Sequence, residues 1–452
     1  MSPVAHKKDA TGYMMHNGYV SLLFLPSLPA WLLVGGMFWY LMALYYFGVE
    51  SSRTATSLYF GGLALWLSSV LLPRVRTYKF VWVDALFFLF VAVLIGRGVS
   101  AWLTEHEVYS YFKYFPFLVV LPYLAGRLFE LRDIQSFLDV VIGASIVAFP
   151  VVAIELKAAP ANIDRPLLFG YSHGALLAGM TFALGAIAIA GKFLRRGTGG
   201  GSVLQDSFWL SLLGIFSYML VVISARGFLA AMLLAMFLLL LVCGSCGWGR
   251  KVLVAVAVMI PLLLALQLNP QRAGFVAYGV QGLSVATVNA VSTAEGRSLS
   301  DSENEGGNRC AELFGDATHR GNSFAARAQL WMDSFSILKS DPIMGVGPGR
   351  FGSYSCAPYP HSTVLHAMSE LGLLGGISLL MLMGGVAASL LKRLFSSVYE
   401  AGDASCWSLF GIFLLICLSD QVYGNYFQAG MFFLVCGMAV SLSMGSSRAG
   451  LI

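Results

Sequence analysis

Charged residues are scarce in this chain: Asp, Glu, Lys and Arg make up 11% of its 452 residues, whereas hydrophobic residues make up 58%. A soluble domain carries roughly a quarter charged residues, so the composition excludes a soluble globular protein. The net charge is only +5 and the basic residues are spread over short connections, which argues against a nucleic-acid partner. Cysteine is also sparse, at 7 residues, and Cys243 and Cys246 form a lone Cys-x-x-Cys pair with no second pair or histidine beside it, so a metal site is not expected. We therefore expect neither a metal ion nor a cofactor.

In place of charge, the chain has a series of long apolar runs. A run of roughly 17 to 25 apolar residues can cross the hydrocarbon core of a bilayer as a helix. The sequence therefore predicts an all-α, polytopic integral membrane protein with about twelve transmembrane helices. These spans are expected near residues 19–48, 56–73, 80–99, 110–126, 135–154, 172–191, 207–224, 227–246, 252–268, 363–390, 406–423 and 428–446.

The short connections between the spans predict the orientation, because Lys and Arg accumulate on the cytoplasmic side of a membrane. On that side lie Lys7, Lys8, Arg74, Arg76, Lys79, Arg127, Arg132, Lys192, Arg195, Arg196, Arg250, Lys251, Lys392 and Arg393. Both termini are then cytoplasmic, and one large polar loop between the ninth and tenth spans lies outside. We divide the chain into the first nine spans (1–268), an external loop domain with helices (269–362) and the last three spans (363–452).

A second group of cations lies where this rule predicts few, at the outer rim of the helices or on the external loop. Its members are Arg97, Lys113, Arg165, Arg226, Arg327 and Arg350. Snorkelling to lipid phosphates is the alternative explanation for any one of them. A common anionic ligand explains the whole set better, because a charge near the bilayer is costly and arginine binds phosphate through two parallel hydrogen bonds.

His361 closes the external loop directly before the tenth span. Histidine is the natural base near neutral pH, so His361 is a candidate general base; the alternative is a hydrogen-bonded histidine at the membrane interface. Pro360 fixes the angle at which the chain enters the span, and Ser362 or Thr363 is expected to cap the helix that follows.

Two pairs of residues are expected to interact. His366 and Glu370 stand at positions i and i+4 of the tenth span and should touch on one helix face, where the carboxylate either orients a neighbour or forms a structural pair. Cys310 and Cys356 are the two cysteines on the outer side, and an oxidising compartment would allow a disulfide that pins the loop.

The loop also contains two segments with local patterns. Arg327 opens a predicted amphipathic helix that runs to Leu338, with apolar residues at helical spacing, namely Leu330, Trp331, Phe335 and Leu338. The glycine-rich turn 345–350 follows, and its glycines permit close backbone approach or left-handed dihedrals. It is not a nucleotide-binding loop, because no Lys-Ser/Thr pair follows it.

Three segments resemble motifs of the O-antigen ligase and polymerase superfamily, which are bacterial enzymes that handle undecaprenyl-linked glycans. Ser224-Ala225-Arg226-Gly227 is similar to the family's Ser-Arg-Gly at the outer end of a span. Arg327-Ala-Gln-Leu-Trp331, followed by Pro342-Ile-Met-Gly345-Val-Gly347, is similar to its Arg-x-x-x-Trp and Pro-x-x-Gly-x-Gly. His361-Ser362-Thr-Val-Leu365 with Glu370-Leu-Gly372-Leu-Leu-Gly375 is similar to its His-Asn/Ser-x-x-Leu and Glu-x-Gly-x-x-Gly.

The resemblance implies a GT-C-like glycosyltransferase of the bacterial inner membrane, with its active site facing the periplasm. The single large outer loop favours an O-antigen ligase, which transfers the glycan from undecaprenyl diphosphate to a sugar hydroxyl of the lipid A–core. An O-antigen polymerase and a protein O-oligosaccharyltransferase are the alternatives within the superfamily. Direct attack by the acceptor hydroxyl needs no metal and would invert the anomeric centre.

On this interpretation His361 is the general base, and Arg226 and Arg327 are the first candidates for stabilising the departing diphosphate. Binding of the lipid-linked donor is assigned to Arg97, Lys113, Arg165, Arg350, His366 and Glu370. The sequence leaves open whether His361 or His366 is the base, and it leaves the oligomeric state open. The rival class is a transporter or flippase, which predicts an internal repeat and charges near mid-membrane rather than at the outer rim.

Overall fold

The computed structural model describes residues 74–105, 115–158, 174–195, 203–242, 247–269, 323–357, 359–396, 404–418 and 426–445. Every regular element within these ranges is helical and none is a β-strand, which confirms the all-α part of the predicted fold class. The spans predicted at 19–48 and 56–73, and most of the external loop before residue 323, lie outside the described residues. The twelve-span count and the domain limits therefore stay predictions.

The described elements are helices of very different length. They are η1 (Val75–Thr77), α3 (Trp82–Glu105), the π-helical turn η2 (Pro116–Val120), α5 (Leu121–Leu128), α6 (Leu131–Ala158), α7 (Gly174–Arg195), α8 (Val203–Val222), α9 (Arg226–Val242), α10 (Trp248–Leu268), α13 (Ser323–Ser340), η4 (Phe351–Ser353), α14 (Thr363–Ser396), α15 (Ala404–Leu418) and α16 (Tyr426–Gly445). Among them, 5 are long and apolar enough to cross a membrane: α3, α6, α8, α10 and α14. The stretch from η2 to α5, and most of α7, α9, α15 and α16, form shorter apolar helices.

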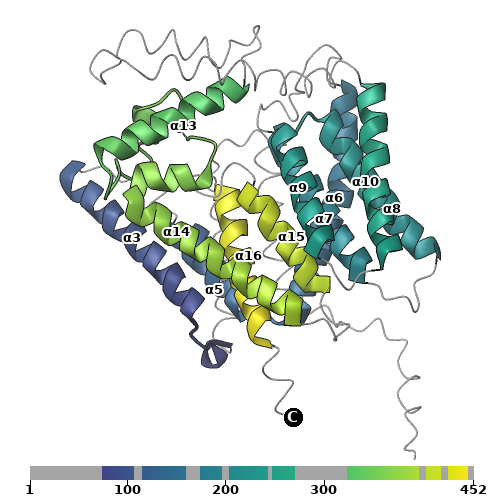
Figure 1. Ribbon diagram of the computed structural model, residues 1–452, viewed down its shortest axis with the longest axis horizontal. Helices are drawn as coiled ribbons and strands as arrows, with labels where there is room; N and C mark the ends of the chain where they lie inside the picture. Colours follow the sequence, from purple (N-terminus) through teal and green to yellow (C-terminus); the bar gives the residue numbers. More distant parts are fainter. Residues whose placement is uncertain are drawn as a thin grey trace, which may run out of the picture.

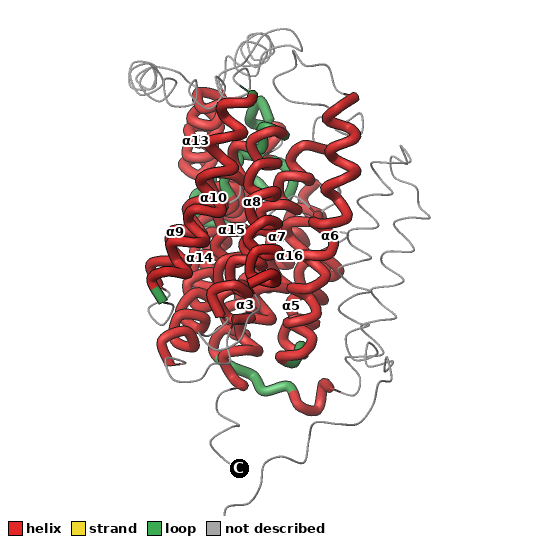
Figure 2. The backbone as a smooth tube through the Cα atoms, turned by 90° about the vertical axis from the view of Figure 1, so that its right-hand side faces the viewer, coloured by secondary structure: helices red, strands yellow, loops and turns green. Residues whose placement is uncertain are grey.

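The helices form two groups with α15 and α16 between them. In Figure 1, α3, α13 and α14 lie on one side, and α6, α7, α8, α9 and α10 lie on the other. Helix α14 packs against α3, α13 and α16, while α15 packs against α7, α9 and α16. Most of the long helices run in a common direction (Figure 2), as expected of helices that cross one bilayer.

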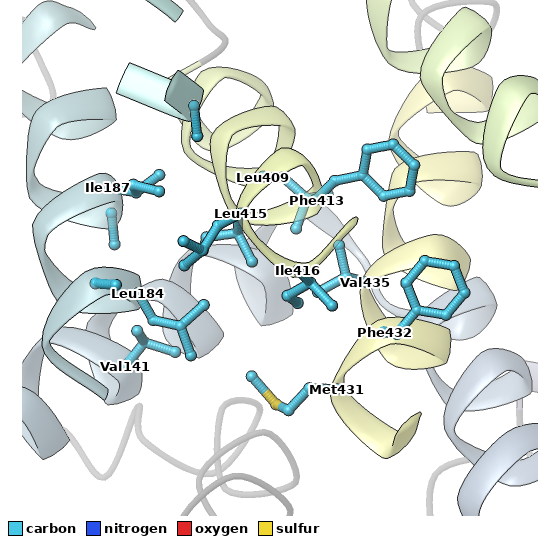
Figure 3. Close-up of a cluster of buried hydrophobic side chains, with 14 of the residues drawn as sticks. Val141, Leu184, Ile187, Leu409, Phe413, Leu415, Ile416, Met431, Phe432 and Val435 are labelled. Carbon is cyan, nitrogen blue, oxygen red and sulfur yellow. The ribbon is translucent and has the colours of Figure 1, made fainter. Parts of the chain in front are cut away.

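Apolar side chains fill the seam around α15 (Figure 3). Ile187 of α7, Ile416 of α15 and Val435 of α16 are all 0% exposed, and the rings of Phe413 and Phe432 stack with centroids 6.2 Å apart. Lipid tails are as apolar as these side chains, so helices associate in a membrane through close packing rather than through burial from water. The central position of α15 and α16 therefore holds the two groups together.

Helices α5 and α16 touch directly through glycines. A Cβ atom added to Gly126 would lie 2.2 Å from the carbonyl oxygen of Leu434, and one added to Gly437 would lie 2.2 Å from that of Tyr123. Such a distance is too short for any side chain, so glycine is required at both positions. Small residues of this kind let backbones approach each other in membrane bundles.

A buried ion pair fixes α3 against α5 near the start of α3. The carboxylate of Asp84, which is 0% exposed, accepts hydrogen bonds from Nε of Arg127 (2.7 Å) and from the hydroxyl of Tyr123 (2.7 Å). The same carboxylate caps the helix by accepting from the Val81 amide at 2.8 Å. Burial beside this carboxylate raises the pKa of Tyr78 to about 12. Arg127, a residue of the predicted cytoplasmic set, thus also has a packing role.

Candidate functional site

Helix α14 is broken at Gly372, where the backbone has φ 69° and ψ −170°. In a regular helix the Leu373 amide would donate to the carbonyl of Ser369. It donates instead to the carbonyl of Pro342, at 2.8 Å, on the loop that follows α13. The predicted span at 363–390 is therefore two helical pieces with a loop inserted at the break.

The inserted loop replaces the helix hydrogen bonds that the break removes. The Val346 amide donates to the carbonyl of Ser369 at 3.0 Å, and the Gly347 amide donates to the carbonyl of Glu370 at 2.9 Å. Buried backbone carbonyls need such partners, so the loop and the break stabilise each other. Two sequence motifs, Pro-x-x-Gly-x-Gly and Glu-x-Gly, form one interlocked junction.

Two glycines allow the loop to come this close. Gly345 has φ 66°, and a Cβ there would lie 2.5 Å from the backbone nitrogen of Gly372. A Cβ on Gly372 would lie 2.0 Å from the carbonyl oxygen of Ile343. Both the positive φ and the lack of space exclude other residues, which is the close approach that the glycine-rich sequence predicted.

The Glu370 side chain binds the far end of the same loop. Its Oε2 accepts from the Gly349 amide at 2.8 Å, and its Oε1 accepts from the Phe351 amide at 3.2 Å. Nε2 of His366 lies 3.1 Å from Oε1, so the predicted contact between positions i and i+4 is present. Glu370 is 1% exposed and His366 is 5% exposed, which places the pair inside the protein.

Arg97 reaches the loop from α3. Its Nη2 donates a 2.5 Å hydrogen bond to the carbonyl of Gly345 and lies 4.0 Å from Oδ2 of Asp341. Its Nη1 is 3.4 Å from the hydroxyl of Ser100, and its buried Nε has no hydrogen-bond partner among the described residues. The guanidinium is therefore held at the junction by one strong bond.

Arg350 ends the glycine-rich turn, and its side chain lies beside Gly347, which also faces α3. A Cβ on Gly347 would lie 3.4 Å from Cδ of Arg350 and 3.8 Å from Cβ of Ala101. Ala101 is one helical turn beyond Arg97 on α3. Arg97 and Arg350 therefore approach the same short stretch of backbone from two elements.

Helix α13 covers the loop through a small apolar cluster of its own. Leu330 and Ile337 of α13 are buried with Val346 and Phe351, and the Ser355 hydroxyl donates to Asp333 at 2.6 Å. The helix was predicted from its apolar spacing, and it is present. The prediction of its buried face needs correction: Trp331 is 39% and Phe335 52% exposed, because Leu330, Ser334 and Ile337 form the face that meets the loop.

Arg327 lies one turn before Leu330 on this helix and is half-buried. It therefore stands on the element that covers the loop, on the same side of the bundle as α14 (Figure 1).

His361 adopts a left-handed backbone conformation, with φ 53°. A residue other than glycine in this region is uncommon and costs about 1–3 kcal/mol, and such strain clusters at functional sites. The ring of Tyr359 meets the His361 ring edge-on, with centroids 5.0 Å apart. The Ser362 carbonyl accepts from the His366 amide at 2.9 Å, so Ser362 is the residue at the N-cap position of α14.

Arg226 begins α9 after a tight turn. Ser224 has φ 57°, its amide donates to the carbonyl of Val221 at 2.9 Å, and the Ala225 amide donates to that of Leu220 at 3.1 Å. This is the bond pattern of a Schellman motif, which ends α8. Helix α9 lies with α6, α7, α8 and α10 in Figure 1, on the other side of α15 and α16 from α13.

Residues 209–380 match the family model described as O-antigen ligase. The match over this segment supports an O-antigen ligase/polymerase superfamily member. A comparison with curated proteins finds no match to the chain. The O-antigen ligase segment runs from α8 into α14, so it includes Arg226, Arg327 and Arg350 and ends within α14, beyond the break at Gly372.

Arg97 lies outside the O-antigen ligase segment and contacts it through Gly345. The structure therefore brings together Arg97, Arg350, His366 and Glu370 around the loop, with His361 and Arg327 on the elements that flank it. Arg226 lies on the other group of helices, and its convergence with these residues stays a prediction. Lys113, Arg165 and Cys310 lie outside the described residues, whereas Cys356 is disulfide-bonded.

Sequence reasoning did not select Tyr359 or Asp341. Tyr359 lies between the two histidines, with its ring centroid 5.0 Å from that of His361 and 6.5 Å from that of His366. Asp341 accepts from the Met344 amide at 3.2 Å and stands 4.0 Å from Arg97. Neither residue belongs to a sequence pattern with recognisable spacing, because both act through a loop whose conformation the sequence does not predict.

Proposed function

We propose that this membrane protein is an O-antigen ligase that transfers a glycan from undecaprenyl diphosphate to a sugar hydroxyl of the lipid A–core. The observation that supports this most is the approach of Arg97 and Arg350 to one loop, beside the helix that His361 leads into. Arginines held at this junction, and a strained histidine directly before the helix that forms it, suit a reaction with an anionic leaving group and a hydroxyl nucleophile.

The reaction needs one bond to form and one to break. The acceptor oxygen attacks the anomeric carbon, the bond from that carbon to the diphosphate oxygen breaks, and the acceptor's proton passes to the base. Because the glycan is already linked to diphosphate, no nucleotide is consumed. A single direct displacement of this kind inverts the anomeric centre.

Stabilisation of the departing diphosphate falls to the arginine side chains. Preorganised cations stabilise charge that develops in a transition state without any metal ion. Arg97 and Arg350 are held at the loop, and Arg327 stands on the helix that covers it. In the proposal, Arg226, Lys113 and Arg165 complete this donor site.

His361 is the better candidate for the base. His366 is 5% exposed and its Nε2 lies 3.1 Å from the carboxylate of Glu370, so that nitrogen is occupied. His361 is half-buried and precedes the helix, where an acceptor hydroxyl can reach it. Tyr359 packs edge-on against the His361 ring and limits the orientations that the ring can take.

The proposal also sets a location. The site would face the periplasm, in a protein of the bacterial inner membrane with both termini in the cytoplasm. The basic connections that support this orientation include Arg74 and Arg127, which lie at the opposite end of α3 from Arg97.

The test is a transfer assay with purified protein, undecaprenyl-diphosphate-linked O-antigen and lipid A–core in the presence of EDTA. A ladder of high-mass lipopolysaccharide is the expected product, and loss of the ladder with His361→Ala would place His361 in the chemistry. Lys339→Ala, at an exposed position of α13, is run beside it as the control.

Two other outcomes would change the assignment. Longer lipid-linked glycan with no attachment to lipid A–core would identify a polymerase instead. No transfer of any kind by folded protein, together with movement of the lipid-linked donor between leaflets of a vesicle, would favour a flippase.

A further inference from the structure

We propose that Glu370 is a positioning residue for the transfer reaction, because its carboxylate holds the backbone on both sides of Arg350. The expected effect of Glu370 on the rate of transfer rests on the proposed function. The structural part of the inference, the attachment of the loop to the carboxylate, is testable without substrate.

The loop binds an anion, which is the carboxylate of Glu370 in the same chain. Gly349 has φ 78° and Arg350 has φ −97° and ψ −4°. A left-handed residue followed by a right-handed one turns successive amides towards one point and forms an anion-binding nest. The Glu370 carboxylate occupies this point, with its oxygens 2.8 Å from the Gly349 nitrogen and 3.2 Å from the Phe351 nitrogen.

It follows that these amides are not available to a donor phosphate. The Gly347 amide is also taken, by the Glu370 carbonyl at 2.9 Å. The glycine-rich loop therefore contributes to the donor site through the side chain of Arg350 and not through its backbone.

The backbone on both sides of Arg350 is fixed by hydrogen bonds. The amide before it and the amide after it both bind one carboxylate, and its own amide donates to the Gly347 carbonyl at 3.3 Å. Phe351, which follows it, is 0% exposed beneath α13. The backbone of Arg350 has little freedom left, so its guanidinium is presented from a fixed origin.

The Glu370 carboxylate cannot position Arg350 by touching the substrate. It is 1% exposed, and its oxygens face two amides and His366. His366 and the break at Gly372 fix the carboxylate in turn. Glu370 therefore acts through Arg350, and we assign it to positioning rather than to direct donor binding.

The kinetic test is a double-mutant cycle with wild type, Glu370→Gln, Arg350→Ala and the double variant, measured as kcat/KM for transfer. A misplacement of about 1 Å can lower a rate by roughly 100-fold, so Glu370→Gln alone is expected to lower kcat/KM by about 10- to 100-fold. In the Arg350→Ala background the same change should cost less than about 3-fold, because residues that act through one another are not additive. Multiplicative losses in the double variant would overturn the proposal.

Controls separate positioning from stability. Asp84→Asn removes an equally buried carboxylate that lies about 20 Å from Arg97 along α3, and it should lower stability without lowering kcat/KM of the folded protein. Glu370→Asp keeps the charge and is expected to retain more activity than Glu370→Gln. A variant in which kcat/KM falls only in proportion to the folded fraction would show a structural role and contradict the proposal.

Hydrogen exchange in detergent without substrate tests the attachment itself. The amides of Gly349 and Phe351 should exchange at least about 10-fold faster in Glu370→Gln than in wild type, as expected when their acceptor is weakened. If wild type transfers no glycan but these amides respond, the proposed function fails and the attachment stands. If wild type is active and the amides do not respond, the positioning role fails alone.

Discussion

Arg97 and Gly345 are separated by 248 positions in the chain, and Nη2 of the arginine donates a 2.5 Å hydrogen bond to the carbonyl of the glycine. This bond joins α3, which precedes the O-antigen ligase segment, to a loop within that segment. Arg97 therefore fixes the loop and, in our proposal, also faces the diphosphate.

The first prediction concerns this bond. Arg97→Ala should lower the free energy of unfolding by about 2 kcal/mol, because a mostly buried hydrogen bond from a charged group is lost. Thermal unfolding in detergent measures the change, and Lys392→Ala, at an exposed position, is the control. Equal melting temperatures for wild type and Arg97→Ala would show that the bond contributes nothing.

The second prediction concerns the break in α14. Gly372→Ala should destabilise the protein and lower transfer activity, since a Cβ there would lie 2.0 Å from the Ile343 carbonyl oxygen and φ is 69°. Gly384→Ala in the same helix is the matched control, because a Cβ there meets nothing within 4 Å. The control should be neutral or stabilising by about 0.5–1 kcal/mol, as expected for Gly to Ala inside a helix. Similar behaviour of the two variants would argue against a real break.

The sequence predicts the helices better than it predicts the junction between the loop and α14. The apolar runs predicted the five described helices that are long and apolar enough to cross a membrane, because hydrophobic length is a direct property of the sequence. The helix α13 was predicted by its spacing, but its buried face was not. Trp331 and Phe335 are apolar yet exposed, because helical spacing of apolar residues does not show which of them meet the rest of the protein.

The junction itself was only partly predictable. The pairing of His366 with Glu370 followed from helical spacing, and the need for close approach at Gly345 followed from glycine. The insertion of the loop into a broken α14 did not follow, because a glycine in an apolar run carries no sign that its helix ends there. The contact between Arg97 and Gly345 depends on long-range packing of α14 against α3, which no local pattern encodes.

The third prediction concerns the buried ion pair of Asp84 and Arg127. Asp84→Asn should lower the free energy of unfolding by about 3–5 kcal/mol, because it leaves the guanidinium buried without its counter-charge. Asp139→Asn removes one partner of the more exposed pair with Lys192 and should cost less than about 1 kcal/mol. Chemical unfolding followed by tryptophan fluorescence compares the two. Equal costs would mean that burial of the first pair is unimportant.

The fourth prediction concerns the disulfide of Cys356. We expect its partner to be Cys310, so that the bond closes a loop within the external domain. Peptide mass spectrometry without reductant should find the two cysteines linked, while Cys406, Cys417 and Cys436 carry free thiols. Cys310→Ser should then free Cys356 for alkylation and lower stability by about 2–4 kcal/mol. A linked peptide that contains Cys243 or Cys246 would contradict the pairing.

The fifth prediction concerns Arg226, the one leading arginine that lies on the other group of helices. If its guanidinium binds the donor diphosphate through two hydrogen bonds, Arg226→Lys should lower kcat/KM nearly as much as Arg226→Ala, because an ammonium cannot form the paired contact. Arg250→Lys is the control, since Arg250 begins the next helix at the opposite end of α9 and donates to the Phe193 carbonyl at 3.1 Å. Full activity in Arg226→Lys would reduce its role to that of a positive charge, and full activity in Arg226→Ala would remove it from the donor site. In that second case the donor would be bound by the loop arginines alone, and Arg226 would serve only the turn between α8 and α9.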